Sequence, residues 1–105
     1  MADPELDALK REFLAEAQEK IEEIATTVAR ESPLASFDRL AYLAHQLKGS
    51  GGSYGFQRIS TDAAELEKAI EHTANGDGNH GEAIKQHVAN LQSEIERGLR
   101  ELKSA

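Results

Sequence analysis

His45 is the side chain whose setting in the sequence best suits chemistry. Counted on a helical wheel, it points about 150° away from the centre of an apolar stripe that begins at Leu40. The other members of that stripe are Leu43, Ala44 and Leu47. A neutral imidazole is a nucleophile near pH 7 and can carry a phosphoryl group on nitrogen. The pattern therefore predicts a solvent-facing histidine that is free to react.

Small residues surround this histidine on the expected helix. At the positions i−4, i+4 and i+7 relative to His45 the chain has Ala41, Gly49 and Gly52. A glycine inside a helix costs about 0.5–1 kcal/mol relative to alanine, so the bare surface needs a reason other than stability. Close approach by another protein is such a reason. We therefore expect these three residues to belong to a partner-binding face.

Cationic and hydroxyl groups lie close to the histidine in the sequence. Lys48 is about 60° round the wheel from His45, where its ammonium could meet an anion attached to the ring. Ser50 and Ser53 add hydroxyl donors nearby. The segment thus combines a nucleophile with groups that can neutralise an anion and donate hydrogen bonds to it.

The motif His45-Gln46-Leu47-Lys48-Gly49-Ser50, followed by Gly55 at the tenth position after the histidine, resembles the histidine-containing phosphotransfer (HPt) domain family. The resemblance implies a helical bundle in which His45 accepts a phosphoryl group from the aspartyl phosphate of a receiver domain. A second receiver domain could then take the group away. The chain would act as a phosphocarrier in a two-component phosphorelay.

The resemblance also implies roles for the neighbours of the histidine. Lys48 would stabilise the phosphoryl oxygens, Ser50 could donate a hydrogen bond, and Gly49 would serve by being small. Glu67 follows His45 by 22 residues, at a position where some members of the family have Gln. A carboxylate there could accept a hydrogen bond from the inner ring N–H, yet it would repel a nearby phosphate.

Receiver domains of response regulators or of hybrid histidine kinases are the partners that the resemblance implies. They would dock over the second helix and supply Mg²⁺, and we expect no metal or cofactor in this chain. Residues 34–60 carry Arg39, Lys48 and Arg58 against Asp38 alone, a local charge of +2 in a chain of net charge −7. This basic segment suits an acidic pocket on a partner, with Arg39 and Arg58 as further contacts. The net negative charge argues against nucleic-acid binding.

Length and composition limit the other possibilities. The 105 residues suffice for one domain, 1–105, but not for an added nucleotide-binding domain, so the chain is not a complete kinase. The absence of cysteine excludes disulfides and thiolate metal sites. The acidic start Met1-Ala2-Asp3-Pro4-Glu5 is unlike a signal sequence, and no apolar run approaches about 18 residues. We therefore expect a chain that does not enter membranes, either a cytoplasmic protein or a cytoplasmic segment of one, and a monomer is the default expectation.

Hydrophobic periodicity predicts four amphipathic helices at about 4–31, 36–52, 57–74 and 82–102. No segment alternates with period two, so we assign no sheet. Four helices with short connections indicate an all-α fold, an antiparallel four-helix bundle. The core stripe expected for the first helix consists of Leu6, Leu9, Phe13, Ala17, Ile21, Ile24 and Val28.

The helix boundaries are predicted from capping and turn residues. Asp3-Pro4 is expected to begin the first helix, because Asp accepts from free backbone amides and proline is tolerated at the first position. Ser32-Pro33 is expected to end it, since the residue before proline disfavours helix. Either Ser36 or Ser32 would cap the second helix. The segment 75–81, rich in Gly, Asn and Asp, is expected to be a loop.

The glycines behind the histidine predict the connection between the second and third helices. Gly51, Gly52 and Gly55 are expected to form a turn. Tyr54 and Phe56 would then fold back onto the core.

A metal enzyme is a competing interpretation, because helical bundles can hold di-iron sites built from Glu and Glu-x-x-His pairs. Neither Glu-x-x-His nor His-Glu-x-x-His occurs in the chain, and the glycines near His45 lack the ending of a P-loop. His72, His80 and His87 lack the setting of His45, and we interpret them as ordinary surface or structural histidines. The glutamates are predicted to lie on outer faces, among them Glu22, Glu23, Glu94 and Glu96.

Two further alternatives stay open. A non-catalytic adaptor bundle would have the same apolar stripes, but it would gain nothing from a histidine framed by small residues. A phosphoacceptor segment from the N-terminus of a chemotaxis-type histidine kinase is the other, since Phe13-Leu14-x-Glu16-Ala17 looks somewhat like those domains. The starting Met and the ending near Ala105 favour a free-standing protein.

Overall fold

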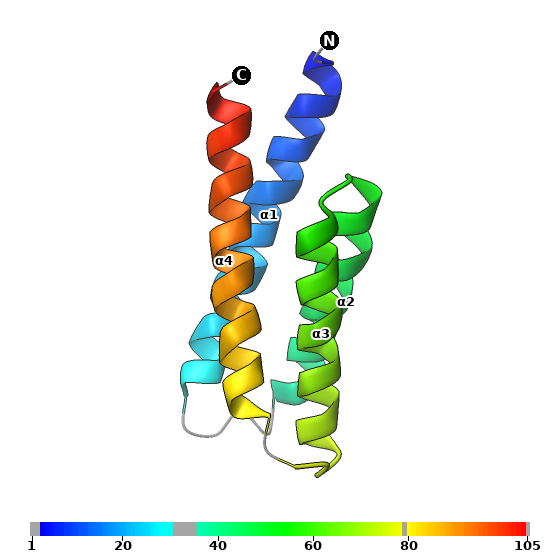
Figure 1. The fold of residues 1–105 in the computed structure, drawn as a ribbon, viewed down its shortest axis with the longest axis vertical. Helices are drawn as coiled ribbons and strands as arrows, with labels where there is room; N and C mark the ends of the chain where they lie inside the picture. The colour runs from blue at the N-terminus through cyan, green and yellow to red at the C-terminus, as the bar shows by residue number, and fades with distance from the viewer. Residues whose placement is uncertain (1–2, 31–35, 79, 105) are drawn as a thin grey trace.

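The computed structural model describes residues 3–30, 36–78 and 80–104, and in this part of the chain the regular structure is helical, without strands (Figure 1). Successive helices run in opposite directions, so the start of the first helix and the end of the last lie at the same end of the bundle. The expected all-α, antiparallel four-helix bundle is confirmed. The helices are α1 (Pro4–Ala29), α2 (Phe37–Ser53), α3 (Gln57–Ala74) and α4 (Gly81–Ser104).

Helix α1 begins as its first residues predict. The carboxylate of Asp3 accepts hydrogen bonds from the backbone N–H of Glu5 at 3.0 Å and of Leu6 at 3.3 Å. These bonds satisfy amides that have no partner within the helix. The helix ends at Ala29, with Arg30 as its C-cap, which is shorter than the predicted end at residue 31. The stop signal Ser32-Pro33 and the possible cap Ser32 lie outside the described residues.

The capping and turn predictions around α2 need two corrections. Ser36 occupies the N-cap of α2, but its hydroxyl makes no capping hydrogen bond. Gly51 and Gly52 are helical, and α2 continues to Ser53, so the turn is shorter than predicted. Of the three glycines, Gly55 alone has positive φ, at 82°.

The remaining boundaries agree closely with the sequence. Helix α3 has the predicted limits, and Gly76 and Gly78 adopt positive φ in the following loop. Helix α4 begins at Gly81, the last residue of the predicted loop, and runs past the predicted end at 102.

All four helices contribute to one hydrophobic core, and no polar or charged residue among those described is fully buried. Each fully buried leucine or isoleucine side chain stabilises the fold by about 1.5–3 kcal/mol relative to an exposed one. Phe13 of α1 stacks against the rings of Tyr54 and Phe56, with centroid separations of 5.3 and 5.6 Å. The prediction that these two aromatic residues fold back onto the core is therefore confirmed. The largest fully buried side chains are Leu14, Ile21, Ile24, Leu40, Leu43, Leu47, Ile59, Leu66, Ile70, Leu91 and Ile95.

The first turns of α1 do not belong to the core. Leu6 and Leu9 were predicted to be core residues, but 41% and 47% of their surfaces are exposed. Helices α1 and α4 extend beyond the connection between α2 and α3 (Figure 1). At that end of the bundle, Leu6 and Leu9 therefore lack a helix from the other pair to cover them.

Candidate functional site

His45 lies on α2 with 64% of its side chain exposed, and it contacts the neighbouring helix through one ring nitrogen. Nδ1 lies 3.0 Å from Oε2 of Glu67 on α3. A carboxylate accepts hydrogen bonds and does not donate them, so this contact requires the proton on Nδ1. The other nitrogen, Nε2, then carries the free lone pair. The site presents a nucleophilic nitrogen on an exposed ring edge whose orientation is fixed by α3.

Lys48 binds the same carboxylate. Its Nζ lies 3.2 Å from Oε1 of Glu67, whereas His45 uses the other oxygen. The Glu67 side chain is only 16% exposed, so a charge there requires a partner. Lys48 supplies that partner and reduces the negative field that Glu67 would place beside the imidazole. The side chains of His45, Glu67 and Lys48 thus form one connected group across α2 and α3.

The small residues around His45 differ in what surrounds them. A Cβ added at Gly49 would have no neighbour within 4 Å, and one at Gly52 would meet only Oγ of Ser60, at 3.5 Å. The surface beside His45 is therefore open at both positions. Ala41 is instead partly buried against the core.

Gly51 has a structural task that the sequence analysis missed. A Cβ there would lie 3.2 Å from the backbone nitrogen of Ser60 and 3.2 Å from Cγ2 of Ile59. Gly51 is buried, and its lack of a side chain lets α2 and α3 approach closely. Ser60 also donates a hydrogen bond to the carbonyl of Lys48, at 2.9 Å. The close approach at Gly51 keeps α2 and α3 at the separation at which Glu67 and His45 form their hydrogen bond.

An open hollow of about 530 Å³ lies next to His45 on the side of α1. Ser50, which is half-buried, lines it and makes no hydrogen bond through its side chain with another described residue. Ser53 donates to the carbonyl of Gly49 at 3.1 Å. The full lining is Lys20, His45, Gln46, Gly49, Ser50, Ser53 and Tyr54.

A family model described as Hpt domain matches residues 8–104, which is nearly the whole chain. The chain belongs to the Hpt domain family. Hpt domains carry phosphoryl groups in two-component phosphorelays, interact with receiver domains of response regulators, and are not kinases. Neither the curated proteins nor the solved structures contain a significant match to this chain.

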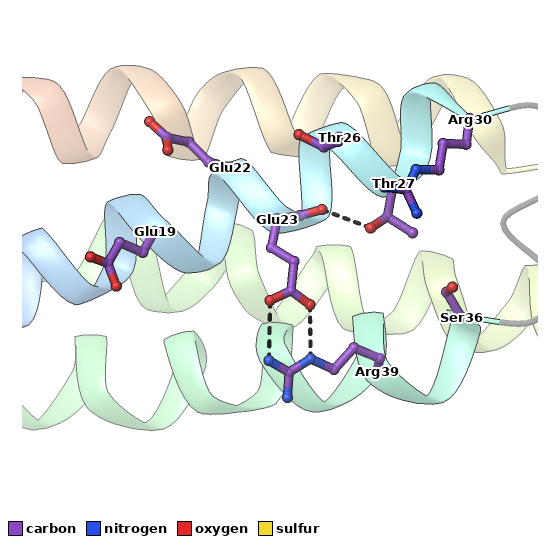
Figure 2. Close-up of a pocket in the computed structure, with 8 residues that line it drawn as sticks. All are labelled: Glu19, Glu22, Glu23, Thr26, Thr27, Arg30, Ser36 and Arg39. Atoms are coloured by element: carbon purple, nitrogen blue, oxygen red, sulfur yellow. Dashed lines mark hydrogen bonds and ion pairs between the residues drawn. The ribbon is translucent and has the colours of Figure 1, made fainter.

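The two arginines expected to contact a partner lie apart from the hollow beside His45. Arg39 reaches from α2 to Glu23 of α1, with guanidinium nitrogens 2.8 and 3.1 Å from the carboxylate oxygens (Figure 2). Hydrogen bonding by Arg39 lowers the pKa of the Glu23 carboxyl. The guanidinium also lies over the ring of Tyr42, 5.8 Å from its centroid. Arg58 lines another hollow with Gly98 of α4, so it lies on the side of α3 that faces α4.

Figure 2 shows a further hollow of this Hpt domain, of about 490 Å³, between the end of α1 and the start of α2. Its labelled side chains are acidic, hydroxyl-bearing or basic, and none is a histidine. The surface that contains His45 therefore remains the candidate site.

The other three histidines occupy different surroundings from His45. The rings of His72 and His80 lie 5.3 Å apart, and His80 contacts the carbonyl oxygen of Asp77 through Nε2 at 2.9 Å. His87 lies beside α3, with Nδ1 3.0 Å from a carboxylate oxygen of Asp62. Each of these contacts lies between the end of α3 and the start of α4 or between α3 and α4 themselves, which accords with a structural interpretation.

Glu94 corrects the prediction that the glutamates lie on outer faces. Burial raises the pKa of Glu94 to about 8, and hydrogen bonding with Asp62 and repulsion from its charge add to the effect. Burial would also raise the pKa of Asp62, but hydrogen bonds from Glu94, His87 and Asn90 outweigh it and lower that pKa. The protonated Glu94 therefore donates to an ionised Asp62. Glu22, Glu23 and Glu96 are exposed as expected.

Sequence reasoning missed three features of this Hpt domain: Lys20 at the hollow, Gly51 between α2 and α3, and the pair formed by Asp62 and Glu94. Position beside a core residue is no signal for the pair, because Glu23 directly precedes the buried Ile24 and is nevertheless exposed. No local signal marks Lys20 either. Within the described residues no group of three potential ligands is arranged as a metal site, and none of the described helices is long and apolar enough to cross a membrane.

Proposed function

We propose that this chain accepts a phosphoryl group on Nε2 of His45 from the aspartyl phosphate of one receiver domain and passes it to another. The observation that carries the proposal is the bond between Nδ1 of His45 and Glu67 at 3.0 Å, on a ring that is 64% exposed. This contact holds the imidazole in the tautomer that leaves Nε2 nucleophilic. It also leaves the reactive edge accessible to a partner.

In the proposed transfer the only reacting groups are the imidazole of His45 and the aspartyl phosphate of the receiver, so no cofactor of this chain takes part. The lone pair of Nε2 forms a bond to phosphorus while the bond between phosphorus and the aspartyl oxygen breaks. The aspartate of the receiver leaves as a carboxylate with that electron pair. The proton on Nδ1 of His45 stays in place, and the ring gains a positive charge that Glu67 stabilises. Return of the phosphoryl group to a second receiver reverses each change.

The partner supplies the charge neutralisation that the transferred group needs. Phosphoryl transfer depends on positioning and on stabilising the charge of the equatorial oxygens. In this proposal the acidic pocket of the receiver holds Mg²⁺, and the chain itself contributes no metal. Lys48 adds positive charge to the site and prevents Glu67 from repelling the incoming group. Ser50 donates a hydrogen bond.

The docking surface in this proposal is centred on His45 and the open positions Gly49 and Gly52. Arg39 and the exposed ring of Tyr42 lie along the same helix and would contact the rim of the receiver. Arg58, on the side of α3 that faces α4, would act only through its longer-range charge.

The test is incubation of the parent chain and His45→Gln with a phosphorylated receiver domain and Mg²⁺. Label that is stable in base and labile in acid is expected on the parent and absent from His45→Gln. His72→Gln is the matched control, because it removes another exposed histidine, and it should be labelled like the parent. Equal labelling of His45→Gln and the parent would refute the proposal. Receiver binding without any label would favour the adaptor interpretation.

A further inference from the structure

Lys20 of α1 lies at the edge of the candidate site and carries a positive charge without a partner among the described residues. It lines the hollow of about 530 Å³ together with His45. Within the described ranges its ammonium makes no hydrogen bond or ion pair, although Glu16, Glu19 and Glu23 lie nearby on the same helix. Lys48, in contrast, is already bound to Glu67 at 3.2 Å. Lys20 is therefore the cation beside His45 that is still available to an incoming anion.

The orientation of the imidazole decides which side of His45 an attached group would occupy. Nδ1 faces α3, where it contacts Glu67 at 3.0 Å. The two ring nitrogens point in nearly opposite directions, so a group on Nε2 extends away from α3. The hollow lies on that other side, because its lining includes Lys20 of α1 and the half-buried Ser50.

We propose that Lys20 and Ser50 form a binding site for the phosphoryl group carried on Nε2 of His45. The inference rests on the proposed function and deepens it by naming side chains that bind the phosphoryl group. The flexible stem of Lys20 lets its ammonium move within the open hollow to the phosphoryl oxygens. The free hydroxyl of Ser50 donates to the same oxygens. Lys48 has the separate task of neutralising Glu67.

The experiment compares the parent with Lys20→Gln, Lys20→Arg and Ser50→Ala, using phosphoramidate as a small phosphodonor and, separately, a phosphorylated receiver. A small donor has no protein surface, so it reports on contact with the phosphoryl group alone. Lys10→Gln is the matched control, because it removes one lysine from the same helix and does not line the hollow. Circular dichroism and thermal unfolding verify that every variant is folded.

Lys20→Gln is expected to reduce the initial labelling rate about fivefold with both donors, a modest effect because solvent screens the charge of the partly exposed Lys20. Ser50→Ala should reduce it less, and Lys20→Arg and Lys10→Gln should resemble the parent. Phosphorus NMR adds a readout that a structural role would not change. The phosphoryl group on His45 should titrate at higher pH in Lys20→Gln than in the parent, because a nearby cation favours the dianion.

The outcomes separate this inference from the proposed function. A parent that neither donor labels would refute both. A labelled parent with unchanged phosphoramidate labelling and an unchanged titration in Lys20→Gln would refute this inference alone. Slower labelling of Lys20→Gln by the receiver only would show that Lys20 contacts the partner protein and not the phosphoryl group, which also overturns the inference.

Discussion

Oε2 of Glu67 lies 3.0 Å from Nδ1 of His45, although the two residues belong to different helices and are 22 positions apart in the chain. The contact depends on the fold, because the packing of α2 against α3 determines where the Glu67 carboxylate lies relative to His45. It fixes the tautomer of the imidazole and restrains rotation of the ring. The reactivity proposed for His45 therefore depends on a residue outside its own helix.

Replacement of Glu67 tests this dependence. Glu67→Ala is expected to slow labelling by a phosphorylated receiver about tenfold, equivalent to ~1.4 kcal/mol in the barrier, because the ring loses its orienting acceptor. Glu67→Gln should slow labelling less, since the amide oxygen still accepts from Nδ1. The measurement is the initial rate of label incorporation at fixed receiver concentration. Glu65→Ala on the exposed face of the same helix is the control, and a rate for Glu67→Ala equal to that of the control would contradict the prediction.

Gly49 tests whether the open surface beside His45 serves partner access. Gly49→Leu should increase the free energy of unfolding by about 0.5–1 kcal/mol, because leucine favours helix and an added Cβ meets no atom within 4 Å. The same change should slow transfer from the receiver at least about tenfold by steric exclusion. Urea unfolding and labelling rates give the two quantities.

The control for Gly49→Leu is Ala89→Leu, which adds an apolar side chain at an exposed position of α4. It should leave the transfer rate unchanged. Transfer by Gly49→Leu at the parent rate would defeat the steric argument.

Adding a side chain at Gly51 should lower the free energy of unfolding, whereas adding one at Gly49 should raise it. In Gly51→Ala the new Cβ would come within 3.2 Å of the backbone nitrogen of Ser60, an atom that cannot move without displacing α3. The overpacking cost of about 1–3 kcal/mol exceeds the gain in helix propensity, so we expect a net loss of about 1–2 kcal/mol in the free energy of unfolding. Gly49→Ala serves as the comparison in urea unfolding and should be stabilised. A gain in stability for both variants would mean that α2 and α3 are not in close contact at Gly51.

Glu94 predicts a pH dependence of stability. Burial raises its pKa from 4.5 to about 8 in the folded protein, so between these values the folded state holds a proton that the unfolded state releases. The stabilisation that Glu94 contributes is fully present below about pH 4.5 and is lost as the pH rises through about 8. Asp62 has a lowered pKa, so its contribution is lost only as the pH falls, in the acid range below that window.

The measurement is urea unfolding of the parent and Glu94→Gln at pH 5 and pH 8.5. An amide still donates to Asp62 but cannot ionise, so the variant should gain stability relative to the parent by about 1 kcal/mol between the two pH values. This figure allows for solvent screening of the partly exposed carboxyl. Lys85→Gln, at an exposed position of α4, is the control and should show the same pH dependence as the parent. Parallel pH profiles for the parent and Glu94→Gln would contradict the prediction.

The amino-acid sequence by itself determined the four helices, their order and the exposure of His45. These features follow from periodicity within a single helix, which places apolar residues on one face and His45 on another. The limits of α3 were predicted exactly as observed because a turn residue lies at each end, Gly55 before it and Gly76 after it. The motif that begins at His45 is likewise local, so its resemblance to the Hpt domain family requires no tertiary information.

Only the tertiary structure decided the relationships between helices. The shared carboxylate of Glu67, the close approach at Gly51 and the place of Lys20 beside the hollow depend on how helices cross and how far apart they lie. The exposure of Leu6 and Leu9 depends on where the shorter helices α2 and α3 end. Burial between helices raises the pKa of Glu94, and Asp62 from another helix adds to the effect. Spacing along one helix contains no information about these distances, because they arise from the packing of side chains from different segments into a single core.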